Sequence, residues 1–204
     1  MNELVLRNML APANAFATAG SALGQSTLPI IKLSKAGQWV SGAENTPVIE
    51  TRFAADVQGA QVGFICFVAG DVIDEAMVPV ALGQKLSLQD LPEHGPYEGG
   101  DGWQPTAALQ LRAIESGEEY IFKPTSQGGR AAIGDLLKRY GNRLSTGKGG
   151  IPIVELSVSS YEHRRYGRVF KPSFRVAEWR DEAALVNGNA AKLVEEPPND
   201  ETPF

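Results

Sequence analysis

Basic and aromatic side chains are concentrated between residues 161 and 180. A protein that holds single-stranded nucleic acid needs positive charges that follow the phosphates and flat side chains on which exposed bases can stack. This segment supplies both, and two further basic residues precede it. The candidate contact residues are therefore Lys123, Arg130, Tyr161, Arg164, Arg165, Tyr166, Arg168, Lys171, Arg175 and Trp179. The alternative interpretation is a solvated hairpin whose aromatic rings cover the edge of the core.

The charge distribution agrees with a polyanion ligand. Residues 123–180 contain 12 of the 19 basic residues and only four acidic ones, a net charge of +8, whereas the rest of the chain carries −13. The overall charge of −5 hides this asymmetry. A protein with this pattern can bind nucleic acid at one place and remain soluble.

The stretch Thr125–Arg130 is a second candidate for phosphate binding. Its two glycines allow a close backbone approach, and it precedes a predicted helix whose first amide groups would favour an anion. An ordinary helix cap is the alternative interpretation.

Enzymatic chemistry has little support in the sequence. His94 and His163 are far apart, and Cys66 lies in an apolar run that predicts a buried side chain. The acidic run from Asp71 to Glu75 could bind a divalent cation together with distant carboxylates, as in a nuclease, but a charged hairpin turn is favoured. We therefore expect a protein without catalytic residues, metal or cofactor.

The elements that must position these residues are mostly short strands. Apolar or alternating runs predict strands at residues 28–33, 48–57, 62–68, 77–80, 103–114, 120–123, 151–159 and 174–179. Glycine and proline predict a long loop at 90–102. Apolar residues at helical spacing predict one helix from Thr125 or Ser126 to Gly141 or Gly147.

Side-chain alternation predicts which residues of the last strands are exposed. If the strand that begins at Ile151 continues far enough, Tyr161 shares the polar face of Glu155 and its ring is exposed. In the final strand, Phe174 is expected to face the core, with Arg175 and Trp179 on the opposite face.

Together these elements predict a mainly β fold, an OB-like small antiparallel β-barrel with one inserted α-helix. A β-sandwich and an α+β sheet remain alternatives. The predicted organisation is a flexible N-terminal arm at 1–26, a nucleic-acid-binding domain at 27–180, and a disordered linker with an acidic tip at 181–204.

The tip is an acidic run that ends in Pro203-Phe204. It resembles the C-terminal tips of bacterial and phage single-stranded DNA-binding proteins. Residues 118–179 also resemble, more diffusely, uncharacterised phage and prophage proteins. The resemblance of the tip implies that Asp200, Glu201, Pro203 and Phe204 recruit replication or recombination proteins.

The sequence thus predicts a cytoplasmic protein of the bacterial host cell that binds single-stranded DNA without sequence preference, in phage DNA replication or recombination. No membrane partner is expected, and homo-oligomerisation is left open. Two other functions are considered. One is a protein-interaction module that mimics the tip without binding DNA, and the other is a metal-dependent nuclease or recombination enzyme.

Overall fold

The computed structural model describes residues 28–165 and 167–181. The N-terminal arm expected at 1–26, Tyr166, and the tip residues Asp200, Glu201, Pro203 and Phe204 lie outside the described residues. The described part contains nine strands, one α-helix and two short 3-10 helices. In chain order these are β1 (Ile30–Leu33), β2 (Trp39–Ser41), β3 (Thr46–Pro47), β4 (Arg52–Val68), β5 (Asp71–Pro79), η1 (Val80–Leu82), η2 (Leu88–Asp90), β6 (Gly102–Ala113), β7 (Glu119–Phe122), α2 (Gln127–Ser145), β8 (Ile151–His163) and β9 (Gly167–Arg180).

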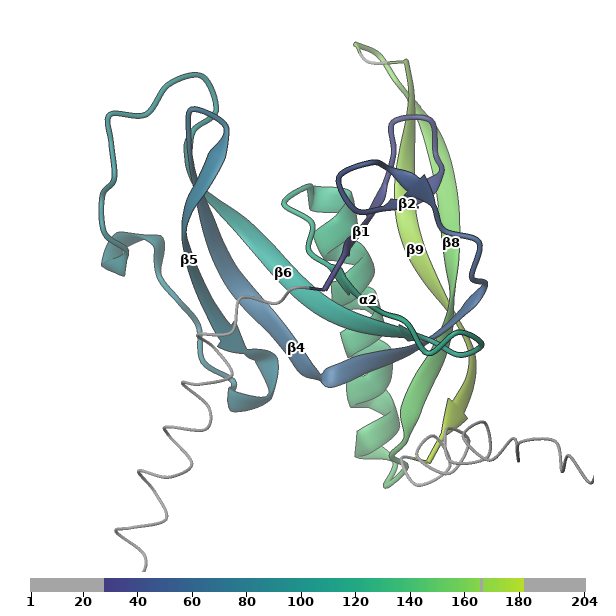
Figure 1. Cartoon of the computed structure of the whole chain (residues 1–204). Coiled ribbons are helices and arrows are strands. Elements are labelled where there is room, and N and C mark those ends of the chain that lie inside the picture. The colour runs from purple at the N-terminus through teal and green to yellow at the C-terminus, as the bar shows by residue number, and fades with distance from the viewer. Residues whose placement is uncertain (1–27, 166, 182–204) are drawn as a thin grey trace, which may run out of the picture.

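The strands form one curled, mixed sheet that makes a half-barrel (Figure 1). Eight of them follow the order β3-β2-β1-β7-β6-β4-β8-β9, and β5 pairs with β4 beside this path. The predicted mainly β fold with one helix is confirmed for the described residues. The prediction of a purely antiparallel sheet is wrong, because β1 runs parallel to β7, with Ile30 opposite Ile121.

Strand β4 is longer than the sequence pattern indicates. Residues 48–57 and 62–68 were expected to be two strands, yet 52–68 form one strand that pairs with β5, β6 and β8. The pairing with β6 shifts register between Asp56 and Gln61. At this irregularity the Asp56 carboxylate accepts a hydrogen bond from the Gly59 amide at 2.8 Å. The bulge bends the strand without reversing it.

The hairpin between β4 and β5 turns earlier than expected. Asp71–Glu75 were predicted to form a charged turn, but they are the first residues of β5. The turn is made by Ala69 and Gly70, whose φ angles are 54° and 85°. Positive φ at both central residues is what a two-residue hairpin turn of type I′ requires. The prediction failed because Ala-Gly is a weaker turn signal than the acidic run that follows it.

The helix and the core follow the sequence pattern closely. Ser126 caps α2 by accepting a hydrogen bond from the Gly129 amide at 3.2 Å, and Gly147 follows the helix end with φ 74°. Ile133 and Leu136 of α2 are fully buried against the concave side of the sheet. The rings of Trp39, Phe122 and Phe174 contact one another there, with centroids 5.4–6.2 Å apart. Cys66 is buried with a free thiol, as predicted.

Two long hairpins extend beyond this core. Figure 1 shows β4 and β5 on one side and β8 and β9 on the other, with α2 between them. We name β8–β9 (residues 151–180) the basic hairpin. Residues 61–101, which comprise the second half of β4, β5 and the loop that leads to β6, are named the acidic arm. In the part of the chain that the structure describes, no helix has the length and apolar character needed to cross a membrane.

Candidate nucleic-acid interface

The basic hairpin carries most of the predicted contact residues. Its ladder runs from Ile151 opposite Arg180 at the base to His163 opposite Gly167 at the end. The connection was predicted to span 161–168, but the strands continue almost to its middle. Arg164 and Arg165 therefore lie at the extreme end of the hairpin, where both are exposed.

The face of the hairpin that points toward the core changes character along its length. Near the base, Val154 and Phe174 are buried in the core. Further out, Phe170 packs on the turn between β1 and β2. A Cβ atom on Gly37 in this turn would lie 2.6 Å from Phe170 Cδ1, and Gly37 has a positive φ of 78°. Only glycine fits this position, so the contact fixes the middle of the hairpin to the β1–β2 turn.

The opposite face presents the predicted aromatic residue. Tyr161 has 47% of its surface exposed and lies 6.5 Å from the His163 ring, centroid to centroid. Its place on the same face as Glu155 confirms the predicted alternation. Lys171 lies opposite Ser159 and therefore belongs to the Tyr161 face too. An exposed ring flanked by cations is the arrangement on which a base can stack.

Two predicted arginines already contact carboxylates. Arg175 forms an ion pair with Glu155, and Arg168 lies 3.6 Å from Glu162. All four residues belong to the hairpin itself. A phosphate that approaches Arg168 or Arg175 must therefore compete with a glutamate. Exposed pairs of this kind are weak, so they lower the contribution of these arginines without removing it.

Trp179 is placed apart from the other candidates. It was expected to share the exposed face of Arg175, but the pairing of β8 with β9 shifts between Ile153 and Val154, which inserts Ala177 as an extra residue. The shift reverses the alternation beyond this point. The Trp179 ring stacks on Tyr140 of α2 at 6.1 Å, and Arg143 lies 4.7 Å from its centroid. Trp179 therefore packs against the helix at the base of the hairpin.

The base of the hairpin also holds an ion-pair network. Glu178 binds Arg52 of β4 and Arg180, whose Nη2 lies 2.7 Å from Glu178 Oε1. The hydrogen bond from Arg180 outweighs partial burial and, with the charges of both arginines, holds the pKa of Glu178 below its usual value. This network connects β8–β9 to the first half of β4.

The remaining predicted residues meet at the start of α2. Lys171 of β9 lies against Gly128, where a Cβ atom would be 3.5 Å from Lys171 Cγ. Arg130 donates from Nε to the Thr125 carbonyl at 3.1 Å, and Lys123 forms an ion pair with Glu75. A cavity of about 280 Å³ lies between β1, the start of α2 and β9, and its basic lining residues are Lys123 and Lys32. Lys32 was not among the predicted contact residues, because it is a single lysine on a short strand that only the tertiary fold brings here.

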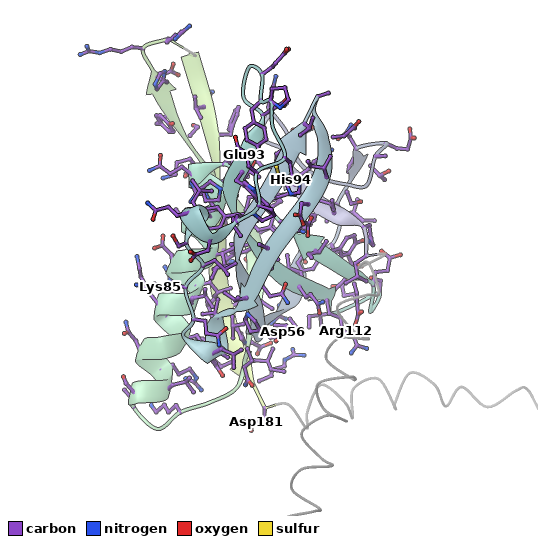
Figure 2. All side chains as sticks on the ribbon, turned by 90° about the vertical axis from the view of Figure 1, so that its left-hand side faces the viewer. Asp56, Lys85, Glu93, His94, Arg112 and Asp181 are labelled. Carbon is purple, nitrogen blue, oxygen red and sulfur yellow. The ribbon has the colours of Figure 1, made fainter. Side chains whose placement is uncertain are left out.

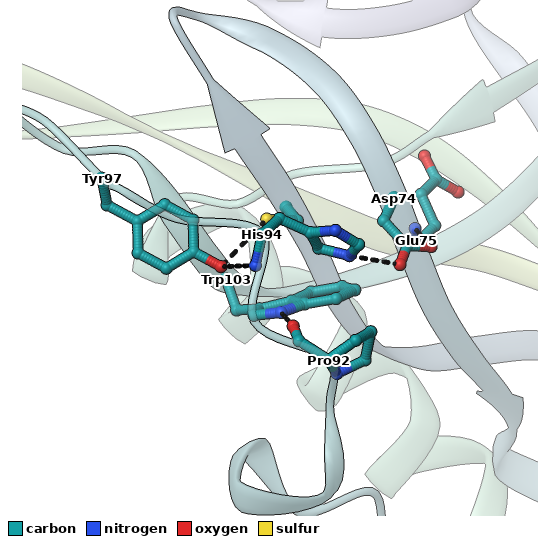
Figure 3. Close-up of polar contacts among 7 residues, drawn as sticks. Asp74, Glu75, Pro92, His94, Tyr97 and Trp103 are labelled. Carbon is teal, nitrogen blue, oxygen red and sulfur yellow. Dashed lines mark hydrogen bonds and ion pairs between the residues drawn. The ribbon is translucent and has the colours of Figure 1, made fainter.

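The polar residues of the acidic arm contact one another and neighbouring parts of the sheet (Figure 3). His94 Nε2 lies 2.7 Å from Asp74 Oδ2, and the Tyr97 hydroxyl accepts a hydrogen bond from the His94 amide at 2.9 Å. Trp103 Nε1 donates to the Pro92 carbonyl at 2.8 Å. Among the described residues, no group of three or more His, Cys, Asp or Glu could hold a metal ion. The acidic run of β5 thus anchors the loop that follows it and contacts Lys123.

Comparison with known proteins finds no relative of this chain. No family model, curated protein or solved structure matches the chain.

Proposed function

We propose that this protein binds single-stranded DNA without sequence preference and that the basic hairpin is its primary binding element. The observation that carries the proposal is the outer part of β8–β9, where the exposed Tyr161 ring lies on a strand that leads to Arg164 and Arg165. Stacking on an aromatic ring tolerates every base, because every base has a π-face. Arginines at the end of the hairpin would contact the phosphates on either side of the stacked base.

The fold supports an OB-like interpretation. In this proposal, β4, β6, β7, β8 and β9 are the five strands of a partly open Greek-key barrel, and α2 joins the third strand to the fourth. The OB fold binds oligonucleotides with its second and third strands and with the loops that follow the first and the fourth strand. Here those connections correspond to the acidic arm and the end of the basic hairpin. Strand β1 would occupy the seam between β7 and β9, where the barrel would otherwise close.

The distribution of basic residues supports binding along the phosphate backbone of the DNA. Lys171, Arg130 and Lys123 extend the positive charge of the hairpin toward the start of α2. Single-stranded DNA that follows this path releases bound cations, so the affinity falls as salt rises, with a log–log slope of about −0.7 per neutralised phosphate. The proposed setting is DNA replication or recombination of a phage in the cytoplasm of its bacterial host.

A titration of labelled poly-dT with the full chain tests the proposal. Binding should weaken strongly between 50 mM and 200 mM salt, a matched duplex should bind more weakly, and an RNA of the same length shows whether the sugar matters. Absence of salt-dependent poly-dT binding would refute the proposal. Magnesium-dependent cleavage of the strand would favour the nuclease alternative.

The partner-recruiting role of the tip is part of the same proposal and rests on the resemblance of residues 199–204. Deletion of Thr202 to Phe204 should leave poly-dT affinity equal or higher. It removes no positively charged side chain, and it shortens the acidic tip that would compete with DNA for the basic surface. The same deletion should abolish capture of replication or recombination proteins. Partner capture that survives the deletion contradicts this role.

A further inference from the structure

A second groove lies on the concave side of the molecule, between α2 and the strands of the acidic arm. Its volume is about 330 Å³, and it is lined by Phe64 of β4, Pro105 of β6, Arg130, Gly134 and Leu137 of α2, and Lys85 from the loop after η1. Figure 2 shows Lys85 beside α2. Phe64 and Pro105 face each other in the β4–β6 ladder, so both belong to the same face of the sheet.

Gly134 lies on the α2 side of this groove and, having no side chain, leaves the groove unfilled there. A Cβ atom on Gly134 would meet no atom within 4 Å, so there is space for a side chain that the sequence does not provide. Glycine inside a helix destabilises it by about 1 kcal/mol relative to alanine. Gly134 therefore keeps the groove open at a cost to the helix.

The lining combines an apolar floor with positive edges. The Phe64 ring is partly exposed and Pro105 is exposed, while Lys85 and Arg130 are the charged residues of the wall. None of the described residues that line the groove carries a carboxylate. A flat apolar group attached to an anion fits this combination, whereas an aliphatic ligand would leave the two cations without a role. A nucleobase with its phosphates has this chemistry.

The groove is continuous with the proposed DNA path. Arg130 lies in the first turn of α2, two residues after Gly128, against which Lys171 of the basic hairpin packs. In the proposed path, a strand that leaves the hairpin at Lys171 would cross the first turn of α2 to reach Arg130 and then enter the groove between the helix and Phe64.

We propose that this groove is a base-binding subsite, in which one unstacked base of the single-stranded DNA lies on Phe64 while Arg130 and Lys85 contact the neighbouring phosphates. The subsite rests on the proposed function, and it adds a contact point that the basic hairpin does not contain.

Filling the groove tests the subsite without removing any existing side chain. Gly134→Met places a flexible apolar chain in the groove, and Gly141→Met places the same chain on an exposed part of α2 where a Cβ also meets no atom within 4 Å. Both replacements favour the helix, so both variants should be at least as stable as the parent in thermal melts. Gly134→Met should weaken poly-dT binding about tenfold, the effect of losing one stacked base, and Gly141→Met should not.

Two readouts separate the possible failures. Parent protein that does not bind poly-dT refutes the proposed function itself. Parent-like binding by Gly134→Met, with normal binding by the parent, refutes only the subsite.

A deoxyribose-phosphate strand without bases should bind the parent and Gly134→Met equally. Photo-crosslinking of 5-iodouracil DNA should label the peptide that contains Phe64. Crosslinks confined to the basic hairpin would overturn the inference.

Discussion

The two hairpins of this molecule are built alike and charged differently. Each is antiparallel, each ends in a tight turn, and each extends beyond the core. The acidic arm (61–101) contains seven acidic residues and one lysine, whereas residues 157–175 of the basic hairpin contain five basic residues and one acidic residue. The same local architecture therefore presents opposite charge on the two sides of α2.

The two hairpins also differ in where their polar groups point. In the acidic arm, Asp74 and His94 bind each other, Trp103 at the start of β6 donates to the Pro92 carbonyl, and these contacts hold the long loop on the sheet. In the basic hairpin, Arg164 and Tyr161 are exposed near the free end. Contacts that satisfy a group internally stabilise the fold, whereas exposed charge and rings remain available to a ligand. The polar contacts of the acidic arm therefore stabilise the fold, whereas the exposed groups of the basic hairpin are the proposed primary contact with DNA, to which the acidic arm adds only the proposed groove at Phe64 and Lys85.

The strongest test of this division removes the charge at the end of the basic hairpin. The double substitution Arg164→Ala and Arg165→Ala should weaken poly-dT binding by about 50-fold in 50 mM salt and reduce the salt slope by about 1.4, because two phosphate contacts are lost. Fluorescence anisotropy over a salt series measures both quantities. The pair Arg139→Ala and Lys148→Ala removes the same charge from α2 and the loop that follows it, and an equal loss there would show that only net charge matters.

A smaller effect is expected from the aromatic ring. Tyr161→Ala should lower poly-dT affinity about tenfold by removing one stacking contact, while Tyr161→Phe should retain most of the affinity. Ile73→Ala, at the comparably exposed side chain of the acidic arm (46% exposed, against 47% for Tyr161), is the control in the same binding assay. A similar loss in both variants would erase the distinction between the hairpins.

Substitutions in the polar contacts that hold the loop of the acidic arm, away from Phe64 and Lys85, should affect stability and leave binding unchanged. Trp103→Phe keeps an aromatic ring beside His94 and removes the hydrogen bond to the Pro92 carbonyl. The free energy of unfolding should fall by about 1 kcal/mol, measured by urea denaturation, with poly-dT affinity within twofold of the parent. Weaker DNA binding with unchanged stability would place the Pro92–Trp103 contact in the interface.

The smallest effect concerns pH. Because folding lowers the pKa of Glu178, its ionised form stabilises the folded state above the usual pKa of 4.5, and this stabilisation is lost as the pH falls through the lowered value. Glu178→Gln should therefore flatten the acid side of the stability–pH curve between about pH 5 and pH 3. Glu98→Gln in the acidic arm controls for the loss of one charge, and an identical curve for Glu178→Gln and the parent would contradict the prediction.

Sequence reasoning succeeded where local signals dominate. The α2 boundaries followed from Ser126 and from the apolar spacing, and the exposure of Tyr161 followed from strand alternation. It failed where a single residue changes the register. The bulge at Ala177 moved Trp179 to the helix, and the bend near Gly59 joined two expected strands into β4. Lys32, which lines the cavity beside the start of α2, and Lys85 and Phe64 of the proposed subsite could not be predicted as candidates, because each lies far in sequence from the basic segment and only the fold brings it close.

The continuity of β4 has a consequence for engineering this molecule. One strand pairs with β8 at its beginning and with β5 at its end, so the two hairpins share a single covalent support. Neither can be exchanged for a hairpin from another protein as an independent module, since a cut near Gly59 severs the frame that orients both. The two sides of the molecule must therefore be redesigned together, as one mechanical unit.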